Sequence, residues 1–348
     1  MGRTIERRDA QLGHHAGQWW VVGGRSDEGV PLGCVETVTP TGVEPGPTLP
    51  QDWHPMAVCE ADGSLWALGG TRRPHEPVAT VRILDAEAGE WAPGPRLPRP
   101  LRSAAVWVLP QGIVVAGGLG LGAAFGPAEW LREAWLLETG DLNARWRPIA
   151  RLPELRAGGG ARLGPPGTAV WVGGRTPEGD ADEMLVLDLA ADTWHLRPCG
   201  PPGLGARGVS TVADGIVVLA GGHRTVPDTS KRRFGPDHHP VIARCHRVDP
   251  LTGTAAPLPD LPVPRRAATV VPIGPQAVLV LGGEVNGARP GQFTPVAQVD
   301  RIDLEAWTVT EEPPLVEPRV APLVDVRDGQ VLVVGGGSGR VEARRIVS

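Results

Sequence analysis

The chain has 348 residues, of which 41% are hydrophobic and 21% charged, and these values exclude an intrinsically disordered protein. The formal net charge of −5 gives no general attraction to nucleic acid or to an anionic membrane surface, and no apolar run is as long as a membrane span. The charged segment 1–9 also lacks the apolar core of a secretory signal, so we expect a soluble cytoplasmic protein with no nucleic-acid and no membrane partner.

A pair of glycines preceded by four or five apolar residues recurs along the whole chain. Seven copies are present, and their first glycines are Gly23, Gly69, Gly117, Gly173, Gly221, Gly282 and Gly335. The steps between these positions are 46, 48, 56, 48, 61 and 53 residues, a period typical of β-propeller repeats. The chain is therefore an internal repeat of seven units.

The second unit shows the pattern of strands that the others repeat. Residues 55–60 and 64–68 predict a hairpin, and its second strand ends at the glycine pair, where the backbone leaves the sheet. Residues 80–84 predict a third strand, and a fourth begins at Trp91. Each unit is therefore expected to form four antiparallel strands.

A tryptophan stands near the predicted fourth strand of several units, where a large aromatic ring would pack between neighbouring sheets. Trp91, Trp146, Trp194 and Trp307 are interpreted as equivalent residues. The fifth unit departs from the pattern, with residues 251–254 at this place.

These residues resemble the kelch repeat, whose signature is an apolar strand ending in Gly-Gly, followed by an aromatic residue and then a tryptophan. The resemblance covers residues 7–348. It implies an all-β fold, a closed β-propeller of about seven four-stranded blades in one domain over residues 1–348. It says little about function, because kelch proteins include scaffolds, ligand sensors and a few enzymes. Since the chain has no tyrosine, it lacks the residues for the copper-radical chemistry of the galactose-oxidase-like kelch enzymes.

The two ends of the chain predict how the repeat closes. The last unit has three predicted strands and lacks a fourth, whereas residues 7–23 match residues 319–335 without a gap. Residues 2–6 therefore stand where the missing outer strand should be. We expect this N-terminal strand to complete the seventh blade and to remove the exposed sheet edges.

The loop after each glycine pair and the link between successive units are expected on the same face, where they would form a basic rim around the channel mouth. Forked guanidinium donors that converge there suit a carboxylate or a phosphate. The alternative is that the recurrent arginine is structural and pairs with acids such as Glu284, Asp180 or Asp182. The candidate ligand-binding residues are Arg8, His54, Arg102, Arg156, Arg207, Arg266 and Arg319 on the links, with Arg25, Arg72, His75 and Glu284 after the glycine pairs.

The fifth unit carries a much longer loop, residues 223–241, and loops of this length in a compact domain are often functional. Its His223, His238 and His239 are candidate ligands for a divalent transition metal, because neutral imidazoles bind zinc, copper or iron. The alternative is that they are solvent-exposed loop histidines. No other cofactor is indicated, since phosphate-loop and nucleophile-elbow motifs are missing.

Two functions stay open at this point. One is a kelch-type propeller whose rim binds an anionic small molecule, or a peptide or protein segment. The other is a propeller enzyme, including a metal-assisted isomerase, lyase or cyclase, that acts on an anionic metabolite or biosynthetic intermediate. In that enzyme the rim arginines would orient the substrate, and a histidine or Glu284 would act as general base.

Overall fold

The computed structural model consists of β-strands joined by turns and loops, in seven larger sheets and five short two-stranded sheets within the described residues. We number the larger sheets blades 1 to 7 in chain order. The chain divides into two compact units: unit 1 comprises residues 1–158 and 339–341, and unit 2 comprises residues 159–338 and 342–348. The structure describes residues 4–39, 42–50, 53–73, 76–85, 87–122, 128–140, 144–200, 204–205, 208–212, 215–224, 240–289, 292–337 and 339–345.

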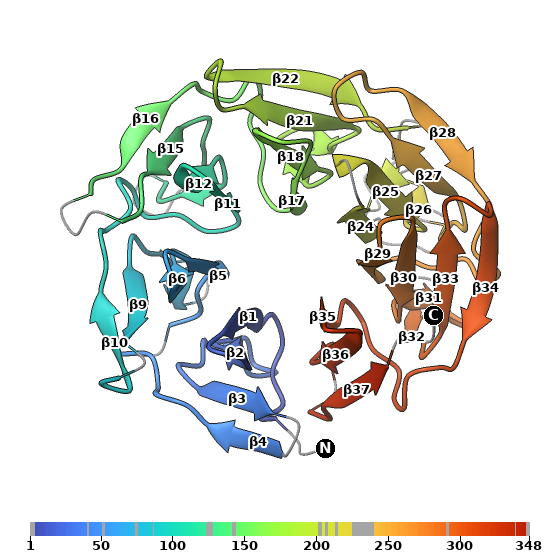
Figure 1. Ribbon diagram of the computed structural model, residues 1–348, viewed down its shortest axis with the longest axis horizontal. Helices are drawn as coiled ribbons and strands as arrows, with labels where there is room; N and C mark the ends of the chain where they lie inside the picture. The colour runs from blue at the N-terminus through green and yellow to red at the C-terminus, as the bar shows by residue number, and fades with distance from the viewer. Residues whose placement is uncertain are drawn as a thin grey trace. The chain divides into compact units, whose positions relative to one another are not determined.

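Unit 1 contains three four-stranded antiparallel sheets (Figure 1). Blade 1 is β1 (Gln11–His15), β2 (Gln18–Val22), β3 (Val35–Thr39) and β4 (Gly42–Pro45). Blade 2 is β5 (Ala57–Ala61), β6 (Ser64–Leu68), β9 (Val81–Asp85) and β10 (Glu90–Pro93). Blade 3 is β11 (Ala105–Leu109), β12 (Gly112–Ala116), β15 (Ala134–Leu137) and β16 (Arg147–Ile149). Two short hairpins follow the glycine pairs of blades 2 and 3: β7 (Thr71–Arg73) with β8 (Glu76–Pro77), and β13 (Leu119–Gly120) with β14 (Glu129–Trp130).

Unit 2 repeats the same topology in blades 4 to 6. Blade 4 is β17 (Gly160–Leu163), β18 (Thr168–Val172), β21 (Glu183–Asp188) and β22 (Thr193–Pro198). Blade 5 is β24 (Gly208–Thr211), β25 (Val217–Ala220), β27 (Cys245–Val248) and β28 (Ala255–Leu258). Blade 6 is β29 (Thr269–Gly274), β30 (Ala277–Leu281), β33 (Val299–Asp303) and β34 (Thr308–Glu312).

Blade 7 has three strands in the described part of the chain: β35 (Leu323–Arg327), β36 (Gln330–Val334) and β37 (Glu342–Arg345). The three short sheets of unit 2 are β19 (Arg175–Thr176) with β20 (Gly179–Asp180), β23 (Leu204–Gly205) with β26 (His223–Arg224), and β31 (Glu284–Asn286) with β32 (Phe293–Pro295). The predicted all-β repeat of four-stranded sheets is confirmed. Among the described elements there is also no helix long and apolar enough to cross a membrane.

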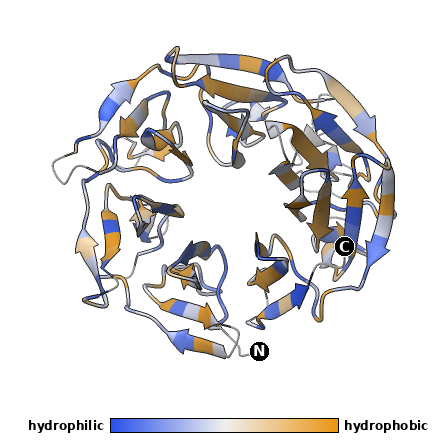
Figure 2. Ribbon diagram, in the orientation of Figure 1, coloured by the Kyte–Doolittle hydropathy of each residue, from blue (hydrophilic) through white to orange (hydrophobic). Residues whose placement is uncertain are grey.

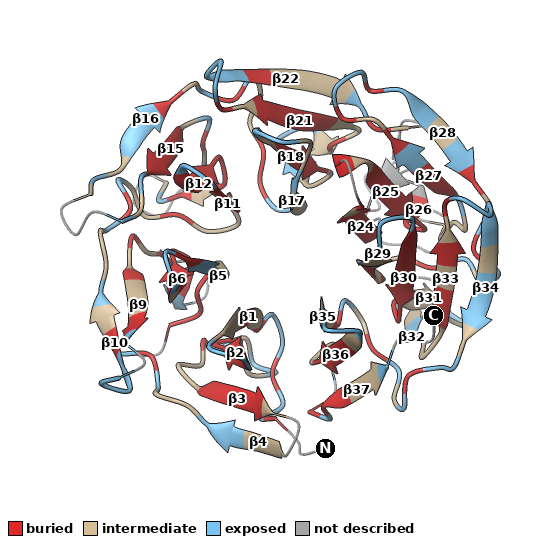
Figure 3. Cartoon of the chain, in the orientation of Figure 1, coloured by how far each residue is buried: buried red, intermediate tan, exposed pale blue. Residues whose placement is uncertain are grey.

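The second strand of each blade is the most hydrophobic, and Figures 2 and 3 show it as apolar and buried. Every residue of β12 is buried, because this strand lies between β11 and β15 and both faces of its sheet are covered. A strand covered on both faces needs a continuous apolar run, which is what precedes each glycine pair. The fourth strands contain more exposed residues, as in β4, β16 and β28.

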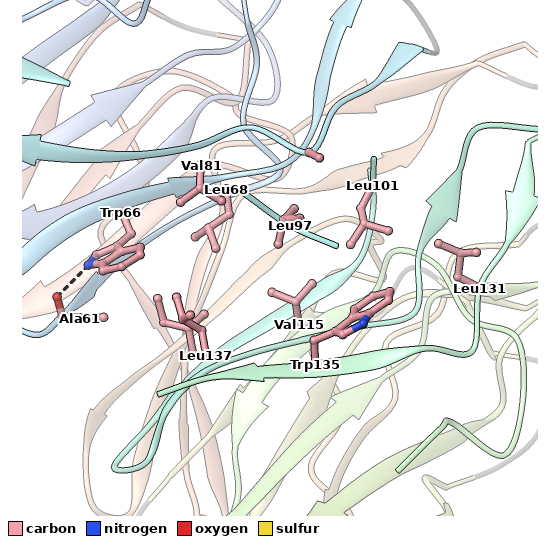
Figure 4. Close-up of a cluster of buried hydrophobic side chains, with 12 residues drawn as sticks. Ala61, Trp66, Leu68, Val81, Leu97, Leu101, Val115, Leu131, Trp135 and Leu137 are labelled. Carbon is pink, nitrogen blue, oxygen red and sulfur yellow. Dashed lines mark hydrogen bonds between the residues drawn. The ribbon is translucent and has the colours of Figure 1, made fainter. Parts of the chain in front are cut away.

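Hydrophobic side chains fill the space between successive blades within each unit. Figure 4 shows Trp66 and Leu68 of blade 2 near Val115, Trp135 and Leu137 of blade 3. Burial of one such leucine contributes roughly 1.5 to 3 kcal/mol. Similar clusters join blades 1 and 2 in unit 1, and blades 4 to 7 pairwise in unit 2. The blades are thus fixed to their neighbours by packing.

The second glycine of a pair allows two segments of backbone to approach closely. Gly70 has a φ of +92°, and a Cβ atom added there would lie 2.1 Å from the carbonyl oxygen of His54. Any other residue would push the link that carries His54 away from the loop that follows β6. This glycine therefore helps to set the position of His54.

The tryptophans of the fourth strands pack between neighbouring blades, as expected. The indole Nε1 of Trp91 in blade 2 donates to the carbonyl oxygen of Pro47 at 2.7 Å, beyond the last strand of blade 1. Trp146 of blade 3 makes the same bond to Pro95 at 2.9 Å. Each tryptophan thus joins its own blade to the preceding one.

Trp307 is not the equivalent of these residues, and this expectation was wrong by two positions. Trp91 pairs with Leu84 and Trp194 with Leu187, but the corresponding partner in blade 6, Ile302, pairs with Val309. Trp307 instead lies in the turn before β34, with a φ of +58° and a side chain stacked 5.0 Å from the guanidinium of Arg247 in blade 5. The turn has the same length as its equivalent in blade 4, with four residues between Asp303 and Thr308 as between Asp188 and Thr193. Trp307 follows Asp303 by only four residues, so it falls within the turn.

The N-terminal segment contacts Gly339, which stands between β36 and β37 in the sequence. The backbone N–H of Thr4 donates to the carbonyl oxygen of Gly339 at 2.7 Å, and the Thr4 hydroxyl donates to the same atom at 3.1 Å. The N–H of Ile5 then bonds to the carboxylate of Glu36 in blade 1. Of the predicted closing strand 2–6, residues 2 and 3 lie outside the described residues. Residues 4–6 make these contacts without forming a β-strand, so the described part of this segment does not add a fourth strand to β35, β36 and β37.

Candidate functional site

The links between blades pair with the loops that follow the glycine pairs. Antiparallel bridges join the following residues: Arg8 with Arg25, His54 with Thr71, Arg102 with Leu119, and Arg266 with Glu284. Each bridge brings one link residue and one loop residue of the same blade to the same end of its sheet. The predicted adjacency of these two sets of loops is therefore confirmed within each of these blades.

The residue that precedes each bridge is buried, and in four blades it is an arginine. Arg7 is 8% exposed, and Arg156, Arg265 and Arg319 are 0% exposed. Arg7 donates to the carbonyl of Val21, Arg265 to that of Val280, and Arg319 to that of Gly335. Because these carbonyls belong to the end of the second strand or the following glycine, the arginine fastens its link to its own blade.

The buried arginines also form ion pairs inside the blades. Arg7 lies 2.7 Å from Glu36, and Arg265 lies 2.6 Å from Asp300, which is itself 0% exposed. Glu36 and Asp300 occupy equivalent positions on the third strand, since Glu36 pairs with Val21 and Asp300 with Val280. In blade 4 the third strand offers no acid at this place, and Arg156 pairs with Glu154 of its own link. The contacts of the recurrent arginine in these blades are those of the structural alternative, and the ligand-binding role of Arg156 and Arg319 stays a prediction.

A different set of polar residues lies close together in unit 1. We call this set the Arg25 cluster, and its members are Asp9, Arg25, His54, Thr71 and Arg102. Arg25 of blade 1 reaches into blade 2, where its Nη2 donates to the Thr71 hydroxyl at 2.7 Å. Its Nε lies 3.8 Å from Asp9, and its side chain is 23% exposed. Thr71 in turn exchanges two backbone hydrogen bonds of 2.9 Å with His54. The cluster thus joins loops of blades 1 and 2.

His54 is held as a neutral imidazole with a defined tautomer. Its Nδ1 accepts a hydrogen bond of 3.3 Å from the backbone N–H of Gly24, so the ring proton is on Nε2. Burial lowers the pKa of His54 to about 4, with a further lowering by the charge of Arg25 and a small opposing effect of Asp9. At neutral pH this residue therefore offers a hydrogen-bond donor and no charge.

Arg102 of blade 3 extends the cluster to a third blade, because the N–H of Gly70, the residue before Thr71, donates to the carbonyl oxygen of Leu101 at 2.7 Å. Burial lowers the pKa of its guanidinium, and the nearby positive charge of Arg25 lowers it further. Its Nε is buried and has no hydrogen-bond partner among the described residues. Two like charges from blades 1 and 3 are thus held close enough to repel each other. An anion between them would remove this repulsion.

The equivalent loops of unit 2 carry basic residues that are already paired. In blade 6, Nε and Nη2 of Arg266 each lie 2.7 Å from the same Glu284 oxygen, and the guanidinium stacks on Phe293 at 3.5 Å from the ring centroid. His223 of blade 5 lies 3.4 Å from Asp180 of blade 4. These contacts fit the structural alternative, in which rim residues brace loops against each other.

The remaining candidates lie beside the cluster with exposed side chains, or outside the described residues. Arg8 exchanges backbone hydrogen bonds with Arg25, but its side chain is 68% exposed and lies 3.2 Å from Asp27, and Arg72 is an exposed residue of β7. His75, Arg207, His238 and His239 lie outside the described residues. Within the described residues no group of three metal-ligating side chains comes together, and His223 contacts a carboxylate there. The metal site therefore stays a prediction.

Sequence analysis missed Asp9, Thr71 and Phe293. A signal for the cluster was nevertheless present in the repeat. In blade 2 the link reads Trp53-His54-Pro55 where four other links carry the buried arginine, and Trp53 replaces that arginine by donating from its indole to the Gly69 carbonyl at 2.6 Å. Such a local departure from a repeat often marks function.

No family model matches the chain, and a search of curated proteins finds no match. Among solved structures, the chain is similar to one described as "Structure of YjhT", with a TM-score of 0.62 and 14% sequence identity. The match covers 89% of this chain and 99% of that chain. At this level of identity the likeness concerns the fold alone. The chain is a seven-bladed β-propeller.

Proposed function

We propose that this kelch-type β-propeller binds an anionic ligand, either a small molecule or an acidic group of a peptide or protein segment, at the Arg25 cluster. The observation that carries the proposal is that Arg25 bonds to Thr71 while the adjacent Gly70 N–H donates to the carbonyl of Leu101, so that Arg25 and Arg102 meet at the same loop. Among the described residues, Asp9 is the carboxylate that pairs with Arg25. Guanidinium groups bind carboxylates and phosphates through charge-assisted hydrogen bonds. His54 would add a neutral donor from its Nε2.

The arrangement supports a preformed site rather than a flexible surface. Arg25 is oriented by Thr71, and the imidazole of His54 is oriented by the Gly24 amide. Side chains that are fixed before the ligand arrives lose less conformational entropy on binding. The loops of unit 2 are less suited to bind an anion, because Arg266 already has a carboxylate partner in Glu284.

The enzyme hypothesis needs a histidine or Glu284 as general base, and the contacts of His54 and Glu284 give it no comparable support. His54 uses Nδ1 to accept from Gly24, and its other nitrogen carries the proton. One oxygen of Glu284 accepts from both Nε and Nη2 of Arg266, which favours its role as a partner of that arginine. Ligand binding is therefore the function that the described residues support best.

Binding of two simple anions tests the proposal. Acetate and methyl phosphate are titrated into the protein by calorimetry at constant ionic strength, because salt screens interactions of this kind. Replacement of Arg102 by glutamine should weaken binding about tenfold, as expected for one charge-assisted hydrogen bond. Arg25→Gln should have an effect of similar size. Both side chains project from loops, so the backbone bridge between Arg102 and Leu119 should persist.

Arg266→Gln is the matched control, because it removes the same charge from the equivalent position of blade 6. The control should change anion affinity by less than about twofold, since Arg266 is already neutralised. If the wild-type protein binds neither anion, or if Arg266→Gln weakens binding as much as Arg102→Gln, the site is not at the Arg25 cluster.

A further inference from the structure

Asp9 stands at a position where the fold does not require an acid. The residue after each bridge adopts a left-handed backbone conformation in several blades: φ is +58° at Asp9, +55° at Ser103, +71° at Gly158, +51° at Ala267 and +44° at Ala321. In the other four blades, a small uncharged residue adopts this conformation at the equivalent position. The backbone role of this position is shown by bonds such as Gly158 N–H to Ser103 C=O at 2.8 Å.

The side chain of Asp9 is 67% exposed and contributes little to the fold. Its carboxylate lies 3.8 Å from Arg25, a distance at which a solvent-exposed pair adds little stability. Its charge also acts on His54, opposing the lowering of that pKa. Asp9 therefore belongs to the electrostatics of the cluster although its side chain is dispensable for packing.

The charges of the cluster can be counted. Arg25 and Arg102 contribute two positive charges, neutral His54 contributes none, and Asp9 contributes one negative charge, so that the formal sum is +1. The neighbouring Arg8 and Asp27 form a pair of their own and cancel. A cluster with this sum is matched by one negative charge on the ligand.

We propose that Asp9 is a specificity residue, and that it makes the Arg25 cluster select a monoanionic carboxylate over a dianionic phosphate monoester. This inference rests on the proposed anion binding. The second charge of a phosphate would be drawn to the same guanidinium groups but repelled by Asp9. A repulsive element of this kind lowers the affinity for the wrong ligand more than for the right one.

Electrostatics predicts how removal of the Asp9 charge changes the preference. The repulsion between Asp9 and the ligand scales with ligand charge, so the gain in affinity for a dianion should be the square of the gain for a monoanion. A gain of about threefold for acetate would then accompany a gain of about tenfold for methyl phosphate. The ratio of the two affinities should therefore shift about threefold toward the phosphate.

The experiment compares acetate with methyl phosphate at about pH 7.5, where a phosphate monoester is mostly dianionic. The wild-type protein should bind acetate at least as tightly as methyl phosphate, and Asp9→Asn should shift the ratio as described. Asparagine tolerates the left-handed conformation of this position. Asp9→Ser is a second variant that should fold, because Ser103 has the left-handed conformation at the equivalent place in blade 3. It should give the same shift in ratio, so a folding defect of Asp9→Asn alone would be recognised.

Asp62→Asn is the matched control, since Asp62 is also an exposed aspartate in the left-handed conformation, with a φ of +50°, but lies in the turn before β6, at the opposite end of that strand from Thr71. It should leave the ratio within about 1.5-fold of wild type at constant ionic strength. The proposal is overturned if the wild-type protein prefers methyl phosphate, or if Asp62→Asn shifts the ratio as much as Asp9→Asn. In both of those cases anion binding itself would still hold. Binding of neither anion would instead remove the proposed function and this inference together.

Discussion

Blades 1 to 3 of unit 1 and blade 6 of unit 2 have the same backbone arrangement between link and loop, but they differ in whether an acid is bridged to the basic residue there. In each, a link residue bridges the residue after the glycine pair. In blade 6 that bridge places Arg266 beside Glu284, and the two charges cancel. In unit 1 the corresponding partners are Arg25, Thr71 and Leu119, none of which is an acid.

This difference separates two kinds of arginine that look alike in the sequence. The arginine one position before the bridge is buried and holds its link to the blade, as Arg265 and Arg319 do. The arginine at the bridge lies among the loops, and in the proposed site it would be available to a ligand where no acid pairs with it as closely as Glu284 pairs with Arg266. The proposed anion binding thus depends on which partner is missing, and the following variants test that proposal.

The largest effect is expected from the buried ion pair of Arg265 and Asp300. Asp300→Ala should reduce the free energy of unfolding by about 3 to 5 kcal/mol, because it leaves a charged guanidinium buried without its counter-charge. Glu36→Ala should behave similarly in unit 1, since its pair with Arg7 is also buried. Urea unfolding of each variant measures the change.

The bridge arginines provide the comparison for that measurement. Arg102→Gln should cost less than about 1 kcal/mol, because its guanidinium is repelled by Arg25 and has no ion-pair partner in the described part of the chain. A double replacement, Arg265→Leu with Asp300→Leu, should recover much of the loss, since replacing both members of a buried pair is often close to neutral. Equal losses for Arg102→Gln and Asp300→Ala would contradict the division into two kinds of arginine.

A smaller effect is expected from the protonation of His54. Its pKa is about 4 in the folded protein and near 6.5 when unfolded, so the unfolded state takes up the proton first as the pH falls. The stability that depends on the neutral imidazole is present above about pH 6.5 and is lost as the pH approaches 4. Between pH 7 and about pH 4.5 the wild-type protein should lose about 2 kcal/mol from this group alone.

His54→Asn isolates that contribution. The asparagine side-chain oxygen can accept from the Gly24 amide in place of Nδ1, but it does not titrate. The wild-type and variant proteins share all other acids, so the difference between their pH profiles of unfolding free energy reports His54. Parallel profiles from pH 7 to 4.5 would show that the imidazole is not held neutral.

The architecture could be predicted from the sequence because the repeat encodes it seven times. The glycine pairs give the ends of the second strands, and an apolar run before each pair gives a strand buried on both faces. The candidate site was harder to predict from the sequence. The pattern placed Arg156 and Arg319 with Arg8 and Arg102, because a shift of one residue along a link changes a buried side chain into an exposed one.

Two further features lie beyond what a single sequence shows. Trp307 was assigned to the wrong position because residue type was weighed above spacing: it follows Asp303 by four residues, whereas Trp194 follows Asp188 by six, and the structure places Trp307 in the turn with a φ of +58°. Asp9 was not singled out, because its approach to Arg25 depends on the bridge between Arg8 and Arg25. Charge pairing between loops is a three-dimensional property, whereas strand periodicity is a local one.

The smallest energetic effect is expected from a change that makes blade 6 resemble unit 1. Glu284→Gln removes the counter-charge of Arg266 while keeping a side chain of the same shape, and the loss of this partly exposed pair should cost about 1 kcal/mol or less. Phe293 should keep the guanidinium in place through its stacking contact. A freed and still oriented arginine should then bind an anion weakly, so calorimetric titration with acetate should show a second binding event that the wild-type protein lacks.

Adding Arg266→Gln to this variant should remove the second event and leave the first. If Glu284→Gln instead gains no second event, a missing acid is not sufficient to make a bridge arginine bind, and the cooperation of Arg25, Arg102 and His54 in unit 1 is the property that matters.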